Sequence, residues 1–337
     1  MNDYSIFDLL NQDSNDQISK MNKNDKLELL ILINKFFLEY RKKIKLNKKT
    51  TFGVEIEFEN KNIGEIKYDD IYKNINSWRY VSEYSVDSGG ELVSPILYDS
   101  KKKWETLKEK CHELQSNAKI LNKASNHIHV GANILSKKEE NIKNITKLWY
   151  AYEDIIYRFG YGEYLNYRPN IYAYAQPLRN SSLNIQRQLK YFDYLDFLYQ
   201  GTRNKSLNFK NTMFKNIKYK NTIEVRCPNG TLNEIIIQNN VNFFTKLFTY
   251  GVSEDCDIDR LNSLISKIEL KDVDLDNFNL IDINRALELS DLIFDNNLDK
   301  IYFLRQYLKN FDITNYYKKA KPFTYKSSVN NLRKCLE

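Results

Sequence analysis

The alternation of apolar and polar residues predicts β-strands that carry charged side chains on one face. The clearest strand runs from Thr51 to Glu59, where apolar residues alternate with Glu55, Glu57 and Glu59. The same period of two occurs at His127–Gly131 and at Thr222–Arg226. Three separate strands are therefore expected to present polar side chains over an apolar backing.

A hairpin and several helices are predicted around these strands. The hairpin consists of strands at Arg79–Tyr84 and Glu91–Ser94 with a glycine-containing turn between them. Apolar residues at helical spacing predict helices over residues 25–44, 100–117, 137–159 and 233–248, and further amphipathic helices up to about residue 309. The region of residues 161–220 is expected to be irregular and aromatic, apart from a helical piece near Gln186 to Phe197.

Composition and charge fit a globular protein with a sizeable interior. The chain has 337 residues, of which 42% are hydrophobic and 28% charged, so disorder is not expected for the chain as a whole. The formal net charge of +7 arises largely from lysine runs that are expected to be solvated faces. A nucleic-acid partner would need that charge gathered on one surface, and none is expected.

The sequence gives no sign of a membrane or secretory location. The N-terminus is polar and acidic and lacks the apolar core of a signal peptide. The longest apolar stretch, Leu29 to Leu38, is interrupted by polar residues and is too short to span a bilayer. The four cysteines form no CxxC pair and no zinc-like spacing. A cytoplasmic protein without a membrane partner is therefore expected.

Candidate chemistry lies on the polar faces of the predicted strands, where residues i and i+2 point the same way. Glu55 and Glu57 would repel each other in a low-dielectric site, and a divalent cation is the usual compensation. His127 and His129 form a second such pair, and Glu224 with Arg226 could join a metal-binding carboxylate to a phosphate-binding guanidinium. Each pair alone also fits a blander interpretation: an exposed strand, a packed histidine pair or a surface ion pair.

Four segments together resemble the motif series of the amidoligase family. This family belongs to the glutamine synthetase-like superfamily of carboxylate–amine ligases. The similarity covers roughly Thr51 to Tyr250, so it includes neither the first nor the last helices. The segments are Gly53-Val-Glu-Ile-Glu-Phe58, Gly90-Glu-Leu-Val-Ser-Pro95, His127-Ile-His-Val-Gly131, and Thr222-Ile-Glu-Val-Arg226 with Gly230-Thr-Leu-Asn233.

The resemblance implies an α+β fold with a strongly curved antiparallel sheet flanked by helices. The implied division is an N-terminal helical segment at residues 1–48, a glutamine synthetase-like catalytic domain at 49–252 and a C-terminal helical region at 253–337. The implied reaction uses ATP and Mg²⁺, which Mn²⁺ could replace, to join a carboxylate to an amine through an acyl phosphate. The two substrates are either small molecules or a peptide or protein.

The resemblance also implies roles for individual residues. By position, Glu57, Glu83 and Glu91 would hold one metal ion, and Glu55, His127 and Glu224 would hold a second near the phosphates. His129 would face the ATP phosphates or assist the second ion, and Arg226 would stabilise the transferring phosphoryl group. Arg168 is a candidate for a further phosphate-binding arginine. Glu83 departs from the family pattern, which has an aspartate in the hairpin motif.

Two other classes of protein stay open at this point. Carboxylate clusters and basic charge also serve metal-dependent phosphodiesterases and nucleases, which would need no ATP. A non-catalytic binding protein could retain the ligase fold without the activity. The full set of acidic and histidine side chains favours the ligase, because a purely structural sheet has no use for so many carboxylates on one face.

Overall fold

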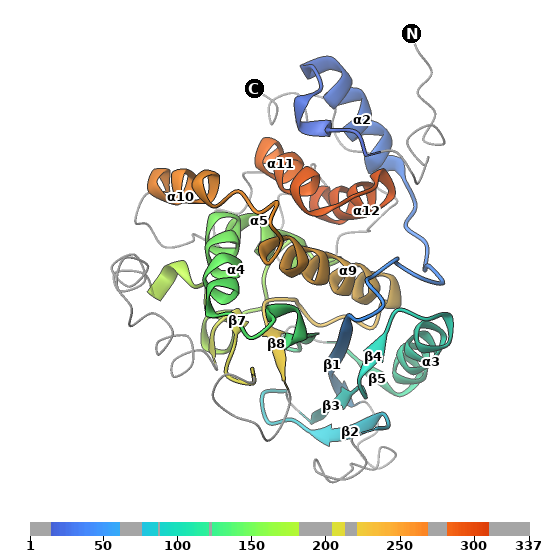
Figure 1. The fold of residues 1–337 in the computed structure, drawn as a ribbon. Coiled ribbons are helices and arrows are strands. Elements are labelled where there is room, and N and C mark those ends of the chain that lie inside the picture. The colour runs from blue at the N-terminus through green and yellow to red at the C-terminus, as the bar shows by residue number, and fades with distance from the viewer. Residues whose placement is uncertain are drawn as a thin grey trace. The chain divides into compact units, whose positions relative to one another are not determined.

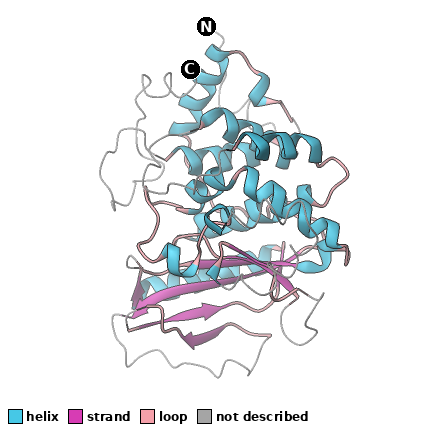
Figure 2. Cartoon of the chain, turned by 90° about the vertical axis from the view of Figure 1, so that its left-hand side faces the viewer, coloured by secondary structure: helices cyan, strands magenta, loops and turns pink. Residues whose placement is uncertain are grey.

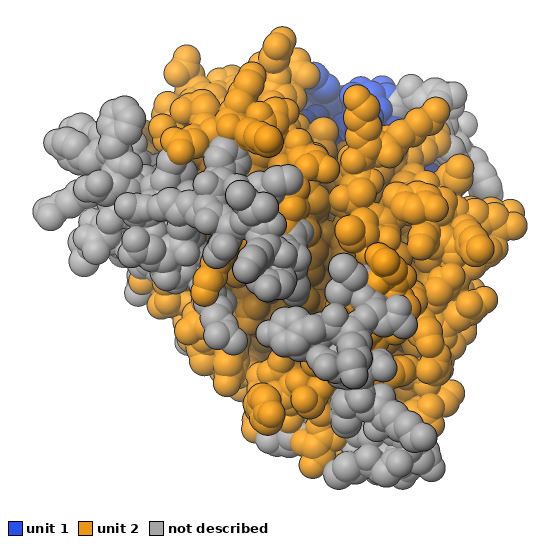
Figure 3. All heavy atoms as spheres, turned by 60° about the horizontal axis from the view of Figure 1, so that its bottom comes forward, with its two compact units in different colours: residues 1–39, 154–167, 274–337 blue, residues 40–153, 168–273 orange. Residues whose placement is uncertain are grey.

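The computed structural model describes residues 15–60, 76–86, 88–120, 123–181, 204–212, 221–268 and 282–309. The chain divides into two compact units (Figure 3). Unit 1 contains residues 1–39, 154–167 and 274–337, and unit 2 contains residues 40–153 and 168–273. Every candidate site residue inferred from the sequence belongs to unit 2.

An open sheet forms the centre of unit 2 (Figures 1 and 2). Its principal order among the described residues is β2-β3-β1-β6-β8-β7, and β4 and β5 pair with β1. All pairings between these strands are antiparallel, as expected. The strands are β1 (Thr51–Asn60), β2 (Arg79–Ser82), β3 (Gly89–Val93), β4 (Leu97–Tyr98), β5 (Ala118–Lys119), β6 (Asn126–Gly131), β7 (Leu207–Asn208) and β8 (Thr222–Val225).

Helices of unit 2 cover the apolar face of this sheet. Helix α9 (Glu234–Gly251) contacts β6 and also contacts helix α3 (Lys101–Asn117). Trp104 of α3 stacks on Phe52 of β1, with ring centroids 4.8 Å apart. Because side chains alternate between the two faces of a strand, the charged side chains of β1 lie on the face opposite Phe52. The sheet and its helices confirm the α+β class that the sequence predicted.

The predicted helices beside the sheet match the structure closely. Ser100 caps α3 and Asn233 caps α9, each accepting a hydrogen bond from a backbone amide of the first turn. The side chains of Asp257, Asp282 and Asn296 cap the three helices that follow. These are α10 (Ile258–Lys267) in unit 2, and α11 (Ile283–Ile293) and α12 (Asn297–Leu308) in unit 1.

The first predicted helix is shorter in the structure than the expected residues 25–44. Helix α2 (Lys23–Lys35) ends where Phe36 adopts an extended conformation, and from Tyr40 the chain belongs to unit 2. There the Gln238 side chain bonds both the N–H and the C=O of Arg41. These bonds satisfy the backbone of Arg41 without a helix, so the second half of the predicted helix is not helical.

The predicted helix over residues 137–159 is interrupted at Tyr152. Helix α4 (Glu139–Ala151) ends there, and helix α5 (Glu153–Gly160) begins at the next residue. The carboxylate of Glu153 is fully buried and accepts hydrogen bonds from Trp149 Nε1 and from the amides of Leu178 and Arg179. The break lets this carboxylate hold a distant segment of unit 2, which helical periodicity cannot reveal.

Shorter elements complete the described structure. They are η1 (Ile18–Lys20), η2 (Ala132–Leu135), α6 (Ile171–Tyr174) and η3 (Arg179–Ser181). The helical piece expected near Gln186 to Phe197 lies outside the described residues. Within the described part of the chain, none of the helices combines the length and the apolar character needed to cross a bilayer.

We expect the substitution Glu153→Ala to destabilise the protein by about 3 kcal/mol, because it leaves buried donors without their acceptor. The Ser206 hydroxyl also bonds this carboxylate, at 3.3 Å. Urea unfolding of the variant measures the loss. Glu109→Ala on the exposed face of α3 is the matched control and should change stability by less than about 0.5 kcal/mol. Equal stability of the two variants would contradict this role of Glu153.

Candidate functional site

The register of the sheet brings the charged faces of four strands together. Glu57 of β1 lies opposite Glu91 of β3. On the other side of β1, Glu55 lies opposite His127 of β6. His129, two residues along β6, lies opposite Glu224 of β8. Residues that pair directly across antiparallel strands share a face, so one surface of the sheet collects these carboxylates and imidazoles.

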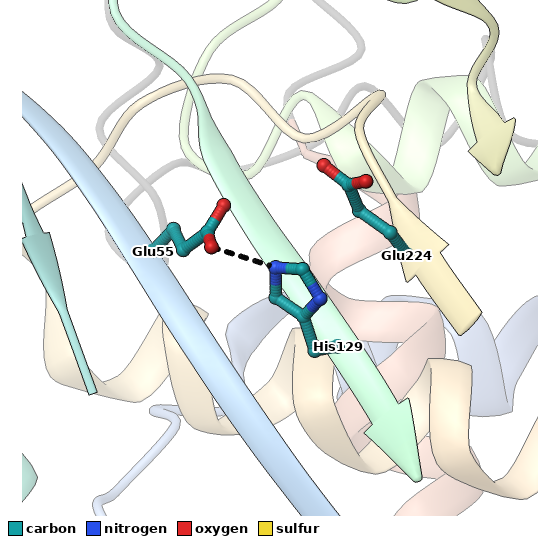
Figure 4. A group of neighbouring side chains, drawn as sticks. All are labelled: Glu55, His129 and Glu224. Atoms are coloured by element: carbon teal, nitrogen blue, oxygen red, sulfur yellow. Dashed lines mark ion pairs between the residues drawn. The ribbon is translucent and has the colours of Figure 1, made fainter. Parts of the chain in front are cut away.

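One group of possible metal ligands consists of Glu55, His129 and Glu224. Figure 4 shows their side chains converging from three neighbouring strands, β1, β6 and β8. One ligand atom from each residue lies within 4.8 Å of the others. His129 Nε2 is 3.1 Å from a Glu55 carboxylate oxygen, and its Nδ1 is 3.2 Å from the Thr222 hydroxyl. The second contact orients the ring so that Nε2 faces the carboxylate.

A second group consists of Glu55, Glu91 and His127, and it shares Glu55 with the first. His127 Nδ1 is 3.1 Å from Glu55 and 3.8 Å from Glu91. Glu57 lies beside this group, with its carboxylate 3.6 Å from His127 Nε2. Both groups offer carboxylate oxygens and an imidazole nitrogen at short range, which fits a divalent cation such as Mg²⁺ or Mn²⁺.

These groups divide the residues differently from the division that the family resemblance implied. The structure places His127 with Glu91, whereas the resemblance paired it with Glu224. The reason is the register, because Glu224 lies directly opposite His129. Glu224 Oε1 is 3.7 Å from His127 Nδ1, so the two groups remain adjacent.

The electrostatics of the site also favour bound cations. Four carboxylates, those of Glu55, Glu57, Glu91 and Glu224, lie within 3.8 Å of the His127 ring nitrogens, and their side chains are at most 12% exposed. Arg226 is paired with Glu224 among the described residues. Burial raises the pKa of Glu224, but the electrostatic interactions with His129, Arg226 and His127 outweigh it and leave the pKa below its usual value. Glu224 is therefore in the ionised form that binds metal.

Arg226 follows the last residue of β8 and is held firmly beside the carboxylates. Its Nη1 donates to Glu224, and its Nε donates to the carbonyl oxygen of Tyr174 at 3.0 Å. The side chain is 16% exposed, so part of the guanidinium is open to a ligand. A planar guanidinium of this kind suits phosphate oxygens.

Two of the expected residues lie apart from these groups. Glu83 follows the end of β2 and is half-buried, and its carboxylate accepts a hydrogen bond from the Ser85 amide. Among the described residues it joins neither group of ligands. The guanidinium of Arg168 donates to backbone carbonyls of the loop after β8. Its donors are thereby directed at the protein backbone.

Two supporting residues were not singled out from the sequence. Ser125 donates its amide to Glu57 at 2.7 Å, and its hydroxyl is 3.0 Å from His127 Nε2. Asn208 of β7 donates its side-chain amide to Glu224 at 2.7 Å. Ser125 precedes His127 by two residues, so strand alternation could have indicated it. Asn208 lies on a two-residue strand without a readable period.

Adding Mn²⁺ or Mg²⁺ to metal-free protein is expected to raise the melting temperature, because a cation relieves repulsion between the buried carboxylates. At a hundredfold excess over Kd the gain in the free energy of unfolding is about 2.7 kcal/mol for each ion bound, or roughly 4 °C for a chain of this size. Differential scanning fluorimetry in EDTA and in each metal measures it. Potassium at equal ionic strength is the control, and an equal rise with potassium would contradict a specific site.

Comparison with known proteins identifies the family. A family model described as "Putative amidoligase enzyme" matches residues 64–248, which is more than half of the chain. This span contains Glu91, both site histidines, Glu224 and Arg226, but begins after β1. Glu55 and Glu57 are therefore joined to the family's segment by the pairing of β1 with β3 and β6. The curated proteins contain no match. The chain belongs to the amidoligase family of ligase-type enzymes.

Proposed function

We propose that the protein is an ATP- and Mg²⁺-dependent ligase that joins a carboxylate to an amine. In this proposal the sheet is of the glutamine synthetase-like catalytic type, and the reaction proceeds through an acyl-phosphate intermediate. The observation that carries it is the pair of adjacent ligand groups that share Glu55, with the guanidinium of Arg226 anchored at their edge. Family membership supports a ligase in general.

The side chains divide into metal-holding and phosphate-holding roles in this proposal. Glu55, Glu91 and His127 hold one ion, with Glu57 beside it, and Glu55, His129 and Glu224 hold the other. Bound divalent ions supply charge neutralisation at the phosphates. Arg226 donates to the phosphoryl group in transfer, and Glu224 keeps the guanidinium in place. His129 lies directly opposite Glu224, which binds Arg226, and is therefore assigned to the phosphate side in this proposal.

The proposed reaction has two steps. In the first, a substrate carboxylate oxygen attacks the γ-phosphorus of ATP, a new O–P bond forms, and the bond to the bridging oxygen breaks to release ADP. In the second, the amine nitrogen attacks the acyl carbon, and phosphate leaves with the former carboxylate oxygen. The amine gives its proton to solvent or to the leaving phosphate. The chain's contribution is positioning and charge stabilisation, as in other phosphoryl transfers.

The carboxylate and the amine are proposed as small molecules or as groups on a peptide or protein, without a nucleic-acid or membrane partner. Helix α6 carries two exposed tyrosines, Tyr172 and Tyr174, and the carbonyl of Tyr174 accepts a hydrogen bond from Arg226 Nε. They belong to the region of residues 161–220 that the sequence predicted to be irregular and aromatic. Each of these two side chains is 40% exposed.

ATP turnover by purified protein tests the proposal. ADP release is measured with Mg²⁺ across a panel of carboxylates and amines that includes amino acids and peptides, with Glu57→Ala and Glu224→Ala as variants. Release that requires both a carboxylate and an amine, and that both variants lose, is the expected result. Calorimetry with ATP and Mg²⁺ is run in parallel.

The failure of ATP to bind in the presence of Mg²⁺ would overturn the ligase proposal. Metal-dependent cleavage of a phosphodiester without ATP would then favour the phosphodiesterase or nuclease class. Binding of ATP without turnover on any panel, together with unchanged binding in both variants, would favour a non-catalytic protein of the same fold.

A further inference from the structure

Arg168 is a buried arginine behind the loop that follows β8. It is 4% exposed, and its Nη2 donates to the carbonyl of Arg226 at 3.0 Å. Its Nη1 donates to the carbonyl of Pro228 at 2.9 Å and lies 3.4 Å from that of Cys227. One guanidinium therefore binds the carbonyls of three consecutive residues. Its own backbone amide donates to the Asn229 side chain, which ties it to the same loop.

The loop needs such support because strand pairing stops just before it. Strand β8 ends at Val225, so the ladder of named strands does not extend to Arg226. The amide of Arg226 instead donates to the Ser206 carbonyl at 2.8 Å. Its carbonyl is the one that Arg168 binds. The backbone of Arg226 is thus held on one side by Ser206 and on the other by Arg168.

We propose that Arg168 is a positioning residue that fixes the backbone of residues 226–228 so that the Arg226 guanidinium faces the nucleotide phosphates. This inference rests on the proposed function. It differs from the sequence-based expectation that Arg168 itself contacts phosphates, because both terminal nitrogens of its guanidinium donate to carbonyls. Arginine suits the task, since its planar fork offers five N–H donors, whereas lysine offers three donors from one nitrogen.

The effect of Arg168 should be visible only in the part of nucleotide affinity that depends on the terminal phosphate. Calorimetry compares the binding of MgATP with that of MgADP for four proteins: wild type, Arg168→Met, Arg226→Met and the double variant. We expect Arg226→Met to lower the ATP-over-ADP preference by roughly tenfold to a hundredfold, the range for a hydrogen bond to a charged group. Arg168→Met should lower it by roughly three- to tenfold.

The double variant provides the decisive comparison. If Arg168 acts through Arg226, adding Arg168→Met to Arg226→Met should change the preference no further. Arg168→Lys should restore part of the preference, because an ammonium can still donate to some of the carbonyls. If Arg168→Met does not fold, Arg168→Lys takes its place in the comparison of ATP and ADP binding.

A matched control separates positioning from general stability. Arg179 is another buried arginine of unit 2 whose guanidinium donates to backbone carbonyls, those of Tyr150 and Ala151. Arg179→Met should lower the melting temperature as Arg168→Met does, but leave the ATP-over-ADP preference unchanged. An equal loss of preference in the Arg179 variant would show a global effect and overturn the inference.

Two further outcomes would also overturn it. One is a loss of ATP and ADP affinity by the same factor in Arg168→Met, and the other is an additional loss in the double variant. Failure of the wild type to bind MgATP would be a different result, because it would refute the proposed function itself. Equal losses of ATP and ADP affinity, or an additional loss in the double variant, would refute the role of Arg168 but leave the ligase proposal standing. Failure of the inference can therefore be distinguished from failure of the proposed function.

Discussion

Replacing Glu55 by glutamine is expected to abolish binding at both metal positions and to lower turnover by roughly a thousandfold. Glu55 is the only residue that belongs to both ligand groups found among the described residues. The neutral amide keeps the shape but removes the charge from each group. Loss of several kcal/mol of charge stabilisation corresponds to a factor of that size in rate.

Counting bound Mn²⁺ by calorimetry or by electron paramagnetic resonance distinguishes Glu55 from its neighbours. We expect the wild type to bind at both groups, and Glu91→Gln and Glu224→Gln each to lose one position. Glu55→Gln should lose both, while Glu109→Gln on the exposed face of α3 should bind as the wild type does. Full Mn²⁺ stoichiometry in Glu55→Gln would show that the shared carboxylate is not a ligand.

The metal-free Glu55→Gln protein should at the same time be no less stable than the wild type. The four clustered carboxylates repel one another, and removing one charge relieves that repulsion. Such opposite changes in stability and activity are typical of residues kept for function. This pair of results would distinguish a metal site from a buried structural network.

The period of the strands was enough to predict which side chains share a face. Alternation placed Glu55 with Glu57 and His127 with His129, and the structure has these residues on β1 and β6. It could not tell which residue of one strand lies opposite which residue of the next. That pairing decides that His129 meets Glu224 and that His127 meets Glu55. Register depends on turns and long-range contacts, which a local period does not contain.

Other differences have the same physical origin. At the interruption at Tyr152, the neighbouring Glu153 binds the distant amides of Leu178 and Arg179, and beyond the end of α2 at Lys35 the distant side chain of Gln238 binds the backbone of Arg41. Neither disturbs the local apolar spacing, so the sequence predicted longer helices. The carbonyl contacts of Arg168 were equally hidden, because an arginine that binds carbonyls and one that binds phosphate have the same local sequence signal.

Replacing Arg226 by lysine is expected to lower kcat by roughly a hundredfold while metal binding changes little. The charge is retained, but the fork that donates to Glu224 and to the Tyr174 carbonyl is lost. A lysine ammonium cannot keep these two bonds and still address phosphate oxygens in a fixed direction. The loss of one preorganised donor to a developing charge typically costs a factor of this order.

The two proposed metal positions provide the internal control for the lysine variant. Mn²⁺ stoichiometry should equal that of the wild type, because Arg226 donates hydrogen bonds and is not itself a ligand. ADP release at saturating ATP, with the carboxylate and amine that support turnover in the wild type, measures kcat. A wild-type kcat in Arg226→Lys would show that charge alone suffices at this position. A lost metal position would instead assign Arg226 to the support of Glu224.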